Sequence, residues 1–133
     1  MKIIEVEGIG PVFAEKLAGA GVETTDDLLA KGATPKGRAD LAAATGIDSG
    51  KMLTWVNHVD LMRLTGVGSE YSDLLEAAGV DSPAELARRN AANLAVTLGE
   101  ANAARSLVRQ VPSEPMVERW IEEAKTLPKI VEH

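Results

Sequence analysis

The chain has 133 residues, a formal net charge of −6 and no cysteine. This length suits one compact domain or two very small ones, and the lack of cysteine excludes disulfides, thiolate metal sites and cysteine nucleophiles. The acidic balance holds in both halves of the chain and disfavours a general nucleic-acid-binding domain, which is usually basic.

The first predicted elements surround a glycine turn, Gly8-Ile9-Gly10. Pro11 follows the turn and suits the first position of a helix. Gly21 is a typical helix end, and Thr24 is a typical N-cap for the next, short helix. The first half of the chain is therefore expected to form helices after the turn, over about 25–31, over about 38–45 ending at Gly46, and from an Asp48 cap to about Leu64, with a turn at 32–37.

The second half repeats the first with an offset of 58 positions, starting at Gly66-Val67-Gly68. Under this offset, Phe13 pairs with Tyr71, Leu17 with Leu75, Gly21 with Gly79, Thr24 with Ser82 and Leu28 with Leu86. Glycines, apolar positions and a cap residue thus recur in one register, which indicates an internal repeat. The second half has extra residues around 88–104.

The later elements of the second half follow from caps and apolar spacing. A short helix is expected over about 83–89, and the closing helix is expected to begin at residues 112–115 and to stop at Pro128. Arg105 and Arg109 have the i, i+4 spacing of residues on one helix face. Trp55 and Trp120 lie in the two closing helices and are expected to anchor the two cores.

Four stretches resemble known sequences: EGIGP at 7–11, GATPKGR at 32–38, WVNHVDLMR at 55–63 and GVGSEYSDLLEAAGVD at 66–81. The glycine turns resemble the helix-hairpin-helix motif of DNA-repair and recombination proteins. The chain as a whole resembles a bacterial family of such tandem repeats, catalogued as a domain of unknown function. The resemblance implies an all-α fold of about eight short helices, and it implies no activity because none is assigned to that family.

The two hairpins are the main candidate sites. A Gly-x-Gly turn exposes backbone amides at a helix start, where they can bind a phosphate without reading sequence. The candidate nucleic-acid-binding residues are Gly8, Ile9, Gly10, Lys16, Lys36 and Arg38. The alternative is that the glycines only join two packed helices. For Gly66, Val67 and Gly68 we favour this structural role, because the acidic Glu70 and Asp73 follow and would repel an anion.

Other polar groups give weaker signals. Thr45 to Lys51 lacks the spacing of a phosphate loop and no strand precedes it. His58 has no partner set for catalysis, and the histidine and carboxylates show no ligand spacing for a metal. Arg88, Arg89, Arg105 and Arg109 are expected to meet acidic groups of this chain or of a partner, and His133 is assigned no role.

We therefore expect two repeats, residues 1–64 and 65–133, packed as one body because each alone is too small for an ample core. The expected function is a non-enzymatic interaction module without cofactor or metal, which docks an unidentified protein partner or self-associates. The alternative is sequence-independent DNA or RNA binding through the first hairpin. Because the apolar runs are too short to cross a bilayer and no signal peptide is evident, we expect a cytoplasmic protein.

Overall fold

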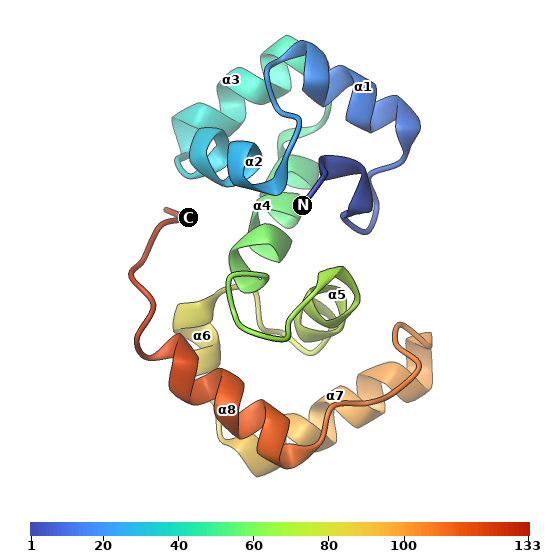
Figure 1. Ribbon diagram of the computed structural model, residues 1–133, viewed down its shortest axis with the longest axis vertical. Helices are drawn as coiled ribbons and strands as arrows, with labels where there is room; N and C mark the ends of the chain where they lie inside the picture. Colours follow the sequence, from blue (N-terminus) through green and yellow to red (C-terminus); the bar gives the residue numbers. More distant parts are fainter. The chain divides into compact units, whose positions relative to one another are not determined.

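The computed structural model describes all 133 residues and contains eight α-helices, one short 3-10 helix and no β-sheet (Figure 1). This confirms the predicted all-α fold class. None of the helices combines the length and the apolar character that crossing a membrane requires. The chain divides into two compact units, described here one at a time: a first unit of Met1–Asp60 with Ile130–His133, and a second unit of Leu61–Lys129.

The first unit contains the 3-10 helix η1 (Ile3–Glu5) and the helices α1 (Pro11–Gly19), α2 (Thr25–Gly32), α3 (Pro35–Thr45) and α4 (Ser49–Leu61, its last residue counted with the second unit). Its core gathers apolar side chains from all of these elements. Leu17 of α1, Leu28 of α2 and Met52 of α4 are fully buried in it. Trp55 packs on Phe13 with ring centroids 5.2 Å apart, which joins α4 to α1.

The helix starts of this unit follow from their caps. Thr24 caps α2 by accepting a hydrogen bond from the Asp27 amide, and Asp48 caps α4 by accepting from the Gly50 and Lys51 amides, as predicted. Helix α3 begins at Pro35, earlier than the predicted residue 38. The reason is that the Thr34 side chain accepts from the Gly37 amide and Pro35 occupies the first helical position.

The second unit contains α5 (Ser69–Ala77), α6 (Pro83–Ala87), α7 (Ala91–Arg105) and α8 (Glu114–Ala124). It has a core of its own, in which Leu75, Leu86 and Leu98 are fully buried. Trp120 packs on Tyr71 with ring centroids 5.3 Å apart, which joins α8 to α5. Each unit thus buries one tryptophan against the aromatic residue of the helix that follows its glycine turn.

The prediction that Arg105 and Arg109 share a helix face is wrong. Helix α7 ends at Arg105, and Ser106 adopts a left-handed conformation with φ 51°. The Asn102 side chain then both donates to the Val108 carbonyl and accepts from the Val108 amide, at 3.1 and 2.9 Å. These bonds turn the chain away from the helix axis before it reaches Arg109.

Candidate functional site

The first glycine hairpin places an uncapped helix start at the surface. Gly8 has φ +88°, Ile9 is buried, and Gly10 is the exposed N-cap of α1. Gly10 has no side chain to cap this helix start, and Pro11 has no amide hydrogen to donate. The hairpin therefore presents backbone groups rather than side chains.

The predicted basic partners do not gather around this hairpin. Lys16 is exposed in the last turn of α1. Lys36 is exposed on α3 and pairs with Asp40 at 3.0 Å. Arg38 is only 5% exposed and is used within the first unit. The sequence analysis did not single out Lys51, whose ammonium lies 5.3 Å from the centroid of the Phe13 ring; Phe13 is the third residue of α1.

The second hairpin has the same local conformation. Gly66 has φ +84°, Val67 is buried, and Gly68 is the N-cap of α5, again without a side-chain cap. The acidic Glu70 stands in the first turn of α5. Its negative charge is unfavourable for an anion at this helix start.

Arg38 is the centre of a different arrangement in the first unit. One terminal nitrogen of its guanidinium, Nη1, donates to the carbonyls of Gly32 and Ala33 at 2.8 and 3.2 Å. The other, Nη2, donates to the carbonyl of Glu132 at 2.7 Å. The side chain therefore fastens the end of α2 to the chain's C-terminal segment, and this use leaves it unsuited to a phosphate.

The C-terminal segment Ile130–His133, called the tail below, binds the first unit as an extended strip without secondary structure (Figure 1). The Glu132 amide donates to the Ala33 carbonyl at 2.8 Å, so both backbone groups of Glu132 are bound. Val131 is 1% exposed and belongs to the core of the first unit. We call the residues that hold this segment, Ala33, Arg38 and Asn57, the tail site.

The last contact of the tail site involves the histidine that the sequence analysis left without a role. His133 Nε2 lies 2.9 Å from Asn57 Oδ1, and Asn57 itself is buried on α4. The side of the tail site nearest α4 is tightly packed, since a Cβ atom added at Gly32 would lie 2.6 Å from Val56 Cγ2. The tail site thus combines backbone recognition, one apolar anchor and one polar contact.

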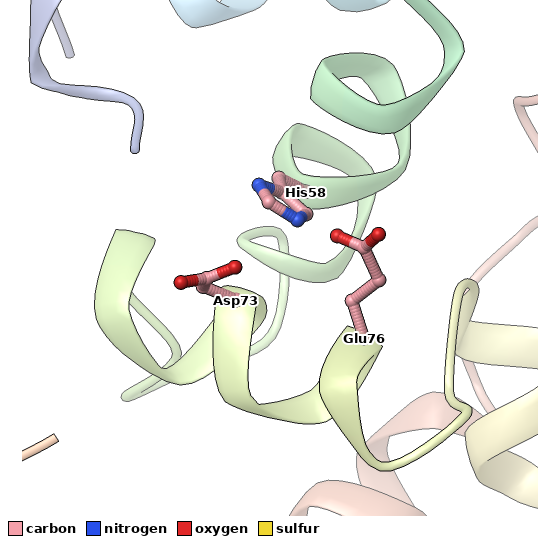
Figure 2. A group of neighbouring side chains, drawn as sticks. All are labelled: His58, Asp73 and Glu76. Carbon is pink, nitrogen blue, oxygen red and sulfur yellow. The ribbon is translucent and has the colours of Figure 1, made fainter. Parts of the chain in front are cut away.

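His58, Asp73 and Glu76 have side chains of the kinds that ligate metal ions. Figure 2 shows Asp73 and Glu76 projecting from successive turns of α5, and His58 projecting from α4. His58 is buried in the first unit, whereas the two carboxylates belong to the second. Neither unit by itself brings together three side chains of the kinds that ligate metals.

Comparison with known proteins gives one result at the level of family. The family described as "Domain of unknown function (DUF4332)" matches residues 7–127. No curated protein and no solved structure matches the chain significantly.

Proposed function

Because the chain belongs to the DUF4332 family, whose description names no activity, we propose a function from the geometry of the first unit. The protein is a non-enzymatic interaction module whose first unit binds an extended protein segment at the tail site. The observation that supports this proposal is the bound tail. Both backbone groups of Glu132 are hydrogen-bonded, and the Val131 side chain is buried.

These contacts have the chemistry of peptide recognition. Main-chain hydrogen bonds supply affinity for an extended segment, and a pocket for one side chain supplies selectivity. Arg38 serves this purpose well because its planar guanidinium donates several hydrogen bonds in a fixed geometry. The segment therefore needs a small branched side chain at the position of Val131, followed by a residue whose backbone faces Ala33 and Arg38.

A binding assay with the tail supplied as a separate peptide tests the proposal. The variant Val131→Asp removes the apolar anchor of the chain's own tail and so opens the tail site. A fluorescein-labelled peptide of sequence Pro-Lys-Ile-Val-Glu-His should bind this variant at least about tenfold more tightly than the unchanged protein, whose own tail competes at an effective concentration on the order of millimolar.

Two controls make this result specific. Ile130→Asp changes an exposed neighbour of the anchor and should leave the tail in place, so peptide binding should stay as weak as in the unchanged protein. Adding Arg38→Ala to Val131→Asp should abolish the gain. If the peptide binds all four proteins equally, the tail site does not recognise peptides.

Self-association is the special case in which a second copy of the chain supplies the segment. Light scattering coupled to size exclusion would then show a dimer that Val131→Asp converts to a monomer. A partner protein as the source would leave the unchanged chain monomeric at all concentrations.

The second candidate is sequence-independent nucleic-acid binding at the first hairpin. The observation in its favour is the contact of the Lys51 ammonium with the ring of Phe13, a residue in the first turn of α1, since helix-start amides and a cation together suit a phosphate. Lys51 takes the place that the sequence analysis gave to Lys36 and Arg38, and Lys16 remains available on α1.

A gel-shift titration with short duplex DNA at low salt tests this candidate. Binding should weaken as salt is raised, because phosphate contacts release counterions. Lys51→Gln should weaken it further, whereas Lys36→Gln should have little effect because Lys36 already pairs with Asp40. An absence of any shift at low salt would rule the candidate out.

A further inference from the structure

The second unit contains a surface pocket of about 300 Å³ between the start of α7 and the exposed side of α8. Asn90 and Arg89 line it at the α6–α7 turn, and Ile121 and Glu122 line it on α8. Ile121 is 5% exposed and supplies apolar surface, while Glu122 is exposed. No part of the tail belongs to this unit.

The pocket of the second unit corresponds in position to the tail site of the first unit. In the first unit, Thr34 caps α3 by accepting from the amide three residues on, and Ala33 beside it binds the tail. In the second unit, Asn90 caps α7 in the same way and lines the pocket. The turn before the capped helix therefore borders both sites.

The helix on the other side of each site, α4 in the first unit and α8 in the second, corresponds as well. Trp55 and Trp120 pack on the aromatic side chains of α1 and α5 with nearly the same geometry, at interplanar angles of 59° and 57°. Two positions after each tryptophan comes a residue that faces the site. Asn57 contacts the tail in the first unit, and Glu122 lines the pocket in the second.

We propose that this pocket binds an extended, basic segment of a partner protein, side by side with the α8 helix. The inference rests on the proposed function, because the tail site shows what the corresponding place in a unit can bind. The two sites differ in charge. Four residues after the cap, the first unit has Arg38, whereas the second has the fully buried Leu94, which cannot bind a peptide carbonyl.

The α8 side of the pocket instead carries a row of carboxylates. Glu114, Glu118 and Glu122 follow one another at i, i+4 spacing, and all three are exposed and line the pocket. The basic residues nearby are already paired: Arg89 with Glu85 at 3.1 Å and Lys125 with Glu122 at 2.9 Å. Because Lys125 pairs with Glu122, it is Glu114 and Glu118 that give the pocket its negative charge, and this charge selects a basic partner and repels nucleic acid.

The spacing of the carboxylates indicates the form of the partner. Four residues of an α-helix rise about 6 Å, and two residues of an extended chain span about 6.6 Å. An extended segment with Lys or Arg at every second position therefore matches the row on α8, while its intervening side chains face Ile121.

Fluorescence anisotropy with the 133-residue chain tests this inference. The probe is a labelled peptide of sequence Lys-Val-Lys-Val-Lys-Ser, and the comparison peptide Lys-Lys-Lys-Val-Val-Ser has the same composition without the spacing. The alternating peptide should bind more tightly. The double variant Glu114→Gln with Glu118→Gln should weaken it about three- to tenfold, the effect of losing two exposed charge pairs.

The matched control is the double variant Glu15→Gln with Glu100→Gln, which removes the same charge from exposed positions outside the pocket and should leave binding unchanged. If both double variants weaken binding equally, or if the two peptides bind alike, the attraction is general and the inference is overturned. Val131→Asp separates the two proposals, because it acts on the tail site and should not alter binding of the alternating peptide.

Discussion

At the scale of single residues, Gly8 shows how the hairpin and the core depend on each other. Its φ of +88° lies in the left-handed region, which costs other L-residues about 1–2 kcal/mol. A Cβ atom at Gly8 would also lie 3.2 Å from the indole nitrogen of Trp55. The turn is therefore fixed both by its own backbone and by the largest side chain of the first core.

Gly8→Ala should lower the free energy of unfolding by about 1–2 kcal/mol, because alanine is strained at this backbone angle. Gly10→Ala is the matched control two residues away, with φ −89° and no atom within 4 Å of an added Cβ, and it should lower the unfolding free energy less, because it loses only the preference of the N-cap position for glycine over alanine. Urea unfolding followed by circular dichroism measures both. Equal losses would show that the conformation of Gly8 is not what stabilises the hairpin.

Asp27 is a residue through which the stability of the first unit responds to acid. The backbone amides of Glu23 and Thr24 donate to its carboxylate, and these hydrogen bonds hold the pKa of Asp27 below its usual 3.8. A lowered pKa in the folded state means that the carboxylate stabilises the fold above its unfolded pKa. This stabilisation is lost as the pH falls through the folded pKa.

Asp27→Asn should therefore lower the urea midpoint at pH 6, and the difference from the unchanged protein should shrink as the pH falls below 3.8. Asp26→Asn removes the neighbouring exposed carboxylate as a control. A difference for Asp27→Asn that stays constant from pH 6 to pH 2 would contradict the assigned hydrogen bonds.

Single residues also show the limit of sequence-based prediction. The conformations of Gly8 and Gly66 could be anticipated, because a Gly-x-Gly turn before a helix is a local pattern. The role of Arg38 could not, because its partner Glu132 lies 94 positions along the chain. Nothing near residue 38 indicates that the guanidinium is buried rather than exposed.

At the scale of elements, helix caps decide where most helices begin and end. Thr24, Asp48 and Ser82 were predictable as caps because each stands just before an apolar repeat. The end of α7 was not, since no glycine or proline follows Arg105 and the helix stops at a left-handed serine instead. The end of α7 instead depends on the hydrogen bonds of the Asn102 side chain with Val108. The usual pattern of a glycine after the last helical residue does not predict such an end.

Ser106→Gly should raise the free energy of unfolding by up to about 1 kcal/mol, because glycine adopts the left-handed conformation without strain. Ala104→Gly, within the last turn of α7, is the control and should lower it by about 1 kcal/mol. Thermal unfolding of both variants provides the measurement. A loss of stability in Ser106→Gly similar to that in the control would mean that the serine is not strained.

At the scale of the whole molecule, each unit has a separate core. The repeated glycines, caps and aromatic residues predict two repeats, residues 1–64 and 65–133, whereas the compact units of the structure are Met1–Asp60 with Ile130–His133, and Leu61–Lys129. The assignment of Ile130–His133 to the first unit had no sequence signal. Ile130 and Val131 are a short apolar pair between Lys129 and Glu132, and such short apolar stretches are common on surfaces.

Leu17→Ala should destabilise the protein by about 2–5 kcal/mol, because Leu17 is fully buried in the first core. Hydrogen exchange followed by mass spectrometry should show the largest acceleration in the amides of α1–α4. Leu75→Ala is the corresponding change in the second core and should act mainly on α5–α8. Uniform acceleration by either variant would show that the two cores open together.

The tail site makes the first unit discontinuous along the chain, and this affects how the protein is synthesised. Every residue of the second unit precedes Ile130–His133 in the chain, so Val131 is the last core residue of either unit to be synthesised. Domains generally fold as units during synthesis, and contacts between distant positions form slowly. The first unit, although translated first, is therefore the one completed last.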